Sequence, residues 1–176
     1  IKTMVDEFAS FARVPKPVIE LADLRDAVQD SVILFRESHP AVIYALHLPE
    51  APVMASFDRR LLTQAVTNLV KNATEALDGL GPNAESGWQG RVDINVMTRD
   101  GTAAVEVIDN GPGLPKHNRA RLLEPYVTTK GHKGTGLGLA IVQKITEQHG
   151  GELLLDDAPP APGRTHGARV TITLPL

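Results

Sequence analysis

Residues 58–77 read DRRLLTQAVTNLVKNATEAL, and this stretch decides the fold class. Its apolar residues recur at i, i+3, i+4 and i+7, which is the spacing of a helix that buries one face. Asp58 stands before the first periodic residue and is expected to be its N-cap. The predicted buried stripe is Leu62, Ala65, Val66, Leu69, Val70, Ala73, Ala76 and Leu77. The predicted solvent face is Thr63, Thr67, Thr74 and Asp78.

A second face of this helix carries two asparagines, Asn68 and Asn72, one turn apart. Asparagine is a mediocre helix former, so a pair at this spacing gains nothing as plain surface. Amide oxygens suit a hard cation such as Mg²⁺, which takes few protein ligands together with phosphate oxygens and water. A simply solvated face is the alternative interpretation of the pair.

Outward from this helix, the chain alternates short apolar runs with further helical patterns. Asp23 is expected to cap a helix that ends near Ser38, and a last helix is expected over residues 136–149. Asp100-Gly101 is a strong hairpin signal. Strands are predicted at 18–21, 41–48, 53–57, 92–98, 103–109, 152–155 and 168–174. Helices mixed with adjacent hairpin strands predict an α/β two-layer sandwich, a mixed sheet with helices packed on one face.

The composition sets limits on function. Hydrophobic residues make up 42% and charged residues 22%, as in a soluble globular domain. A net charge of -3 gives no reason to expect a nucleic acid partner, and the lack of cysteine excludes disulfides and thiolate metal sites. Residues 1–13 read as the end of an apolar-faced helix that starts mid-pattern, as in a piece of a longer protein. That helix is expected to pack on a missing segment or to fold back on the domain.

Asp109-Asn110-Gly111-Pro112-Gly113 follows directly after an apolar strand. A carboxylate at a strand end can accept a hydrogen bond from an exocyclic amine such as that of adenine. The two glycines allow the backbone to approach a ligand closely. An ordinary turn is the alternative interpretation of this segment.

Residues 128–139 read TTKGHKGTGLGL and precede an amphipathic helix. Backbone amides at a helix start form an anion site, and glycine hinges with lysines suggest a lid that closes on phosphates. The chain holds no Gly-Lys pair, which excludes a P-loop. The Gly-x-Gly-x-Gly spacing also fits the dinucleotide-binding fingerprint poorly.

In this order the segments resemble the GHKL ATP-binding superfamily, and within it the catalytic domain of sensor histidine kinases. Residues 68–73 resemble the N box, 109–113 the G1 box, 124–130 the F box and 134–139 the G2 box. The resemblance covers residues 18–176 and implies the Bergerat fold. Residues 4–13 further resemble the end of the dimerisation helices of NtrY-type nitrogen-regulation kinases. The implied domains are a dimerisation-helix tail (1–14) and a catalytic ATP-binding domain (15–176).

The resemblance also implies roles for single residues. Asn72 would hold Mg²⁺ with help from Asn68, Asp109 would bind the adenine amine, and Lys71 and Lys130 would hold the phosphates and serve catalysis. Residues 126–133 would be a mobile ATP lid. The implied nucleotide site comprises Asn68, Lys71, Asn72, Asp109, Gly111, Gly113, Tyr126, Thr128, Thr129, Lys130, Gly134, Thr135, Gly136, Leu137 and Gly138.

One position separates phosphoryl transfer from hydrolysis. Hydrolysing members of the superfamily carry a glutamate base one turn before the metal-binding asparagine, whereas this chain has Asn68, whose amide cannot accept the proton. The resemblance therefore implies a protein histidine kinase domain. Because none of the six histidines has the context of a phosphoacceptor, the acceptor is expected on absent dimerisation helices. A GHKL-type ATPase and a nucleotide-responsive, non-catalytic binding module are the alternatives.

The resemblance also implies partners and a location. The expected partners are ATP, the protein's own dimerisation helices and a response regulator. The full-length protein is expected to be a homodimer, while this fragment could be a monomer. A cytoplasmic location is implied for the domain, with an inner-membrane anchor open for the full-length protein.

Overall fold

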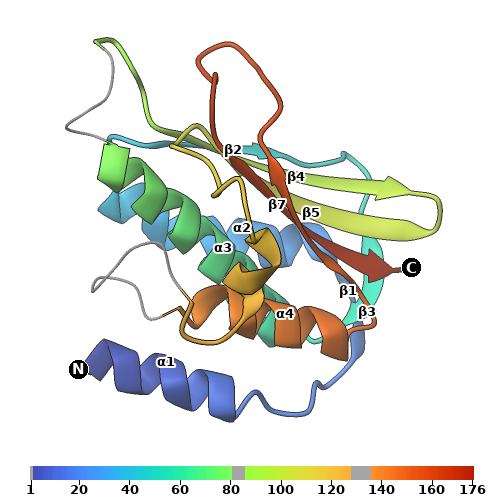
Figure 1. Ribbon diagram of the computed structural model, residues 1–176. Coiled ribbons are helices and arrows are strands. Elements are labelled where there is room, and N and C mark those ends of the chain that lie inside the picture. Colours follow the sequence, from blue (N-terminus) through green and yellow to red (C-terminus); the bar gives the residue numbers. More distant parts are fainter. Residues whose placement is uncertain (1, 81–85, 128–135) are drawn as a thin grey trace.

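The computed structural model describes residues 2–80, 86–127 and 136–176. It has two layers, with the helices on one face of a twisted sheet (Figure 1). The five strands of this sheet run in the order β2-β4-β5-β7-β6, and only the β2/β4 pair is parallel. Their bounds are β2 (Ile43–His47), β4 (Arg91–Arg99), β5 (Thr102–Asp109), β6 (Leu153–Asp157) and β7 (Ala168–Pro175). The predicted mixed sheet with helices on one face is confirmed.

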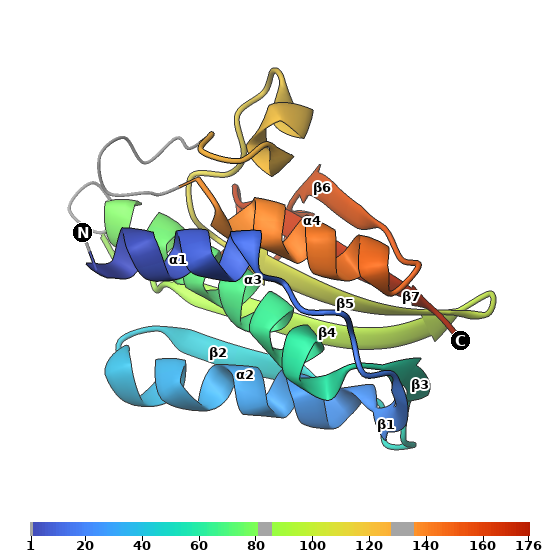
Figure 2. The same ribbon diagram turned by 90° about the horizontal axis from the view of Figure 1, so that it is seen from below.

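Three helices, α2 (Leu24–Ser38), α3 (Arg59–Leu80) and α4 (Gly138–Gln148), cover the same face of the sheet (Figure 2). The predicted caps are present: the Asp23 carboxylate accepts from the Arg25 N–H, and the Asp58 carboxylate accepts from the Leu61 N–H. Two short strands, β1 (Glu20–Asp23) and β3 (Met54–Phe57), pair with each other in a separate two-stranded sheet. A short 3-10 helix, η2 (Arg119–Leu123), lies between β5 and α4 in sequence.

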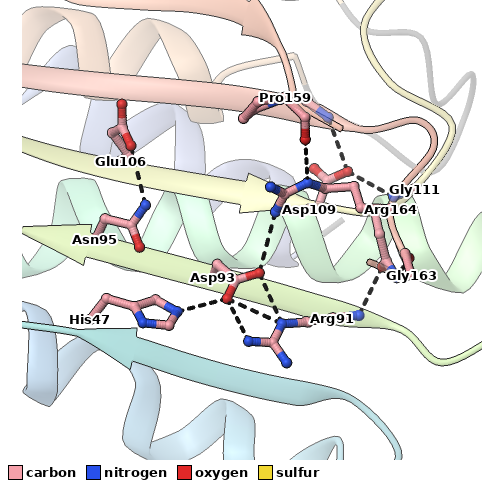
Figure 3. Close-up of polar contacts among 12 residues, drawn as sticks. His47, Arg91, Asp93, Asn95, Glu106, Asp109, Gly111, Pro159, Gly163 and Arg164 are labelled. Carbon is pink, nitrogen blue, oxygen red and sulfur yellow. Dashed lines mark hydrogen bonds and ion pairs between the residues drawn. The ribbon is translucent and has the colours of Figure 1, made fainter. Parts of the chain in front are cut away.

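The β4–β5 hairpin follows directly from its sequence. Asp100 and Gly101 both adopt positive φ, 51° and 76°, as a two-residue turn of this type requires. Alternate residues of β4 point to opposite faces, so Val92, Ile94 and Val96 are buried beneath the helices. The residues between them, including Asp93, lie on the opposite, helix-free face of the sheet (Figure 3).

Thr74 departs from the expectation for α3. It was expected on the solvent face but is only 2% exposed. Its hydroxyl donates to the Val70 carbonyl and lies 2.8 Å from the hydroxyl of Tyr44, which belongs to β2. The helical period places Thr74 on a polar face of α3. In the structure, α2 and β2 pack against this part of α3, and Thr74 is buried there.

The first helix, α1 (Lys2–Ala12), folds back onto α4 at its C-terminal end. Lys144 Nζ donates to the Phe11 carbonyl at 3.2 Å and lies 5.4 Å from the centre of the Phe11 ring. Val5 and Phe8 stay 59% and 50% exposed. One end of α1 therefore contacts the domain, while apolar side chains further along it face outward. Across the described residues, no helix has the length and apolar content to cross a membrane.

Candidate functional site

Asp109 ends β5 beneath the helices, and its carboxylate is held in one orientation. Oδ1 accepts from the N–H of Gly111 at 2.9 Å and from the N–H of Ala168 at 3.2 Å. Within the described part of the chain both of these contacts use Oδ1, so Oδ2 keeps its acceptor capacity. The residue is only 5% exposed, and burial raises the pKa of Asp109 above its ordinary value, although the two N–H donors and the charge of Arg164 act in the opposite direction.

Glycine allows the backbones around Asp109 to approach closely. Gly167 has φ 147°, and a β-carbon there would overlap the Asp109 carbonyl. A β-carbon on Gly113 would lie 3.3 Å from the Gly167 carbonyl oxygen, and one on Gly111 would lie 3.4 Å from the β-carbon of Ala76 on α3. The glycines of the 109–113 turn therefore pack this turn between α3 and the start of β7.

The asparagine face of α3 meets the start of α4. A β-carbon on Gly138 would lie 3.5 Å from Asn72 Oδ1, so this amide lies beside the first residue of α4. Asn68 lies one turn earlier on α3 and is partly exposed. Lys71 Nζ lies 4.0 Å from the Glu75 carboxylate, and both side chains are partly exposed. The structure thus places the Asn72 amide beside Gly138, the first residue of α4.

Tyr126 and Gly136 bracket the glycine-rich loop. The Tyr126 N–H donates to the Gly136 carbonyl at 2.9 Å, and Gly136 has φ 71° directly against the Tyr126 backbone. Leu137 is fully buried in the core, so any contact with a ligand there has to come from its backbone. The predicted site residues Thr128, Thr129, Lys130, Gly134 and Thr135 lie outside the described residues.

Ala168 and Asn110 make contacts at the site that the sequence did not predict. Ala168 holds Asp109 through its backbone N–H, a contact that is independent of its side chain. Asn110 accepts from the Arg91 N–H and donates to the carbonyls of Gln89 and Gly163, which joins the turn to β4 and to the β6–β7 loop. The asparagine within Asp-Asn-Gly-Pro-Gly suggests hydrogen bonds to backbone groups. The sequence does not show which groups these are, because they are distant along the chain.

The residues of the site fit a magnesium ion held mainly through a nucleotide. Among the described residues, no group of three His, Cys, Asp or Glu side chains is arranged to hold a metal ion. The Asn72 amide oxygen beside the start of α4 is a hard oxygen donor, and Mg²⁺ accepts one or two such ligands when phosphates and water supply the rest.

The family of the chain follows from its similarity to known proteins. Residues 57–176 match the family described as "Histidine kinase-, DNA gyrase B-, and HSP90-like ATPase". The chain belongs to this family, and the matched residues form its ATP-binding domain, of the kind found in sensor histidine kinases.

Among the relatives, the chain is 49% identical over 174 residues to the nitrogen regulation protein NtrY of Azorhizobium caulinodans. That match covers 99% of this chain and 22% of the relative, so the chain spans under a quarter of its length. The mycobacterial sensor histidine kinase MprB superimposes with a TM-score of 0.73 at 29% identity, over 90% of this chain and 97% of that one. The catalytic domain of histidine kinase ThkA gives 0.73 at 26% identity, over 89% and 97%.

Proposed function

We propose that this chain binds Mg²⁺-ATP between α3, the 109–113 turn and the start of α4, and that it transfers the γ-phosphate to a histidine on dimerisation helices outside the chain. It is then the catalytic domain of a sensor histidine kinase in a two-component system. Residues 1–14 would be the tail of the dimerisation helix and residues 15–176 the catalytic domain. The full-length protein would act as a homodimer and pass the phosphate to a response regulator.

This proposal is supported by an acceptor, Asp109, and an amide, Asn72, that are linked through α3, because Gly111 of the 109–113 turn packs on Ala76, one turn after Asn72. Asp109 presents Oδ2 with Oδ1 already fixed by two backbone donors, which suits the amino group of adenine. Asn72 lies beside Gly138 at the start of α4, where backbone amides and the helix dipole favour phosphate. Adenine and phosphates would then be bound by different elements that are joined through α3.

The roles of the remaining residues follow from this placement. Asn72, assisted by Asn68, would hold Mg²⁺, which neutralises charge on the phosphates. Lys71 and Lys130 would position the phosphates, and the residues around Tyr126 and Gly136 would anchor the two ends of the lid. Phosphoryl transfer depends on positioning and charge stabilisation more than on covalent help from the protein. The other members of the proposed nucleotide site are Gly111, Gly113, Thr128, Thr129, Gly134, Thr135, Leu137 and Gly138.

Asn68 favours transfer over hydrolysis. Attack by water needs a general base within reach of the nucleophile, and an amide cannot take up the proton. Among the described residues, Glu75 lies further along α3 and 4.0 Å from Lys71, and it would be the candidate base of a hydrolytic mechanism. The 49% identity to a nitrogen regulation protein supports a role in nitrogen-dependent signalling. A cytoplasmic location of the domain is part of the proposal.

The binding step is tested by Mg²⁺-dependent ATP affinity, measured by calorimetry on wild type and Asn72→Ala. We expect a loss of at least about tenfold in affinity, because one metal ligand or charged hydrogen bond contributes about 1.5–3 kcal/mol. Thr63→Ala on the same helix is the matched control, and its affinity should equal wild type. Equal binding by Asn72→Ala and wild type would refute the metal assignment.

The transfer step needs the missing acceptor. The helical histidine fragment of the full-length protein is added in trans with radiolabelled ATP, and phosphate release is followed in parallel. We expect label on the fragment and slow phosphate release. Rapid release without labelling would identify an ATPase, and nucleotide binding without either would identify a non-catalytic module.

A further inference from the structure

The helix-free face of the sheet holds a second polar centre, built around Asp93 of β4 (Figure 3). Asp93 is 8% exposed and contacts three cationic or ionisable side chains. His47 Nε2 on β2 lies 2.8 Å from Oδ1, Arg91 Nη2 lies 2.8 Å from Oδ1, and Arg164 Nη1 of the β6–β7 loop lies 3.4 Å from Oδ2. Three segments that are distant in sequence therefore converge on one carboxylate.

These side chains line a cavity of about 430 Å³ between the sheet and the β6–β7 loop. This volume falls in the range of small-molecule sites. Ile108 supplies an apolar wall, and Ala161 and Gly163 form part of the loop side. The cavity opens on the face of the sheet that lacks helices, so it is separate from the site around Asn72 and Asp109 Oδ2.

The charges in the cavity do not balance. Asp93 is the carboxylate among its lining residues, whereas Arg91 and Arg164 bring two guanidinium groups, which leaves one positive charge in excess before His47 is considered. The carboxylate of Glu106 lies just outside this lining and accepts a hydrogen bond from Asn95 at 3.2 Å. The residues that line the cavity therefore carry one positive charge more than negative charges.

Both guanidinium groups also keep donors for a ligand. Arg91 uses Nε and Nη2 on Asp93, and Arg164 uses Nε on the Pro159 carbonyl and Nη1 on Asp93. Within the described part of the chain, no hydrogen bond uses Arg91 Nη1 or Arg164 Nη2. Asp93 thus fixes two planar cations beside an open volume, and such groups bind carboxylates and phosphates with good geometry.

We propose that this cavity, the Asp93 pocket, binds a small anion that carries a carboxylate or phosphate group, through Arg91 and Arg164. Asp93 serves as a positioning residue that holds the two arginines, and Ile108 contacts the apolar part of the ligand. The pocket adjoins the nucleotide site through Asn110, which donates to the carbonyl of Gly163 in the same loop.

The test uses the ¹⁵N-labelled chain and follows the Nε–Hε resonances of Arg91 and Arg164 by NMR. Inorganic phosphate and malonate are titrated separately, each against sodium chloride at the same ionic strength. We expect saturable shifts with at least one of the two anions, and the anion with the higher affinity identifies the ligand chemistry. Shifts that never saturate, or that chloride reproduces, would overturn the proposal.

Two variants keep the result interpretable. Ala161→Glu adds a carboxylate to the pocket wall without removing a native side-chain contact, since Ala161 bonds to Arg164 only through the backbone. It should weaken the binding of the anion at least about tenfold, as should Arg91→Gln. Arg99→Gln is the matched control, because the Arg99–Asp100 pair is exposed at the far end of the hairpin, and its affinity should stay within about twofold of wild type. Unchanged affinity in Ala161→Glu would place the anion elsewhere.

Discussion

Asp93 and Asp109 stand almost side by side on neighbouring strands but face opposite sides of the sheet. Asp93 pairs in register with Ile108 and Asp109 with Val92, and the two are 8% and 5% exposed. Burial is the largest influence on both carboxylates and by itself raises the pKa of each. At Asp93 the hydrogen bonds from Arg91 and His47, together with the charges of these partners, outweigh burial, so the pKa of Asp93 ends below its ordinary value. At Asp109, which is more deeply enclosed, burial prevails and the pKa is raised.

The difference shows that exposure alone does not decide whether the negative charge of a carboxylate stabilises or destabilises the folded chain. The partners of the carboxylate also decide it. Asp93 has cationic partners, and its negative charge stabilises the folded chain. Asp109 has two backbone N–H donors and no cation in contact with it among the described residues, so its charge is costly until a ligand donates to Oδ2. A group held in a costly charge state is typical of a functional site, where activity is retained at the expense of stability.

The largest expected effect is on nucleotide affinity. Asp109→Asn keeps an acceptor for Gly111 and Ala168 but turns an amide N–H₂ toward the adenine amine, so a hydrogen bond is replaced by a repulsive contact. We expect ATP affinity to fall about 100-fold, measured by calorimetry, because a charged hydrogen bond contributes about 1.5–3 kcal/mol. Asp93→Asn is the control and should bind ATP within about threefold of wild type. Similar losses in both variants would show that the two carboxylates do not have separate roles.

The same two variants should also differ in their free energy of unfolding, and here Asp93→Asn should show the larger loss. Asp93→Asn removes the negative charge that holds Arg91 and Arg164, and we expect urea denaturation to show a loss of about 1–3 kcal/mol. Since both arginines are partly exposed, the loss should be below that for a fully buried ion pair. Asp109→Asn without ATP should match wild type or exceed it by less than about 1 kcal/mol. A larger loss in Asp109→Asn than in Asp93→Asn would contradict the comparison.

The smallest expected effect is the pH dependence of these stability differences. Folding raises the pKa of Asp109. Its contribution to the stability of the folded chain is therefore favourable at low pH and is lost as pH rises from about 3.8 through the folded-state pKa. The pKa of Asp93 is lowered by folding, so its stabilisation is complete above about 3.8 and is lost only as pH falls below that value.

Denaturation of the ATP-free chain between pH 4 and pH 8 checks both signs. The advantage of Asp109→Asn over wild type should grow across the lower part of this range and then level off. The deficit of Asp93→Asn should be nearly constant throughout. A deficit of Asp93→Asn that appears only near neutral pH would point to a different titrating group.

Much of the fold was predictable because its signals are local. The predicted buried stripe of α3 is present except at Ala76, which is only partly buried. This stripe, the cap at Asp58, the Asp100–Gly101 hairpin and the turn after β5 each depend on residues within a few positions of one another. The pairing of β1 with β3 apart from the main sheet was not predicted, since pairing over more than thirty residues has no local signature. The same limit applies to Thr74, whose burial depends on Tyr44 of β2.

The sequence by itself determined the class of the protein and predicted which residues form a nucleotide site. The order of an asparagine-bearing helix and two glycine-rich turns identifies the family, and this local pattern is sufficient to predict Asp109 and Asn72 as site residues. Only the tertiary structure decided the environments of the two aspartates and revealed the Asp93 pocket. Hydrogen-bond partners and burial depend on segments such as the β6–β7 loop and β2, which pack together only when the sheet forms, and a carboxylate takes its pKa from those neighbours.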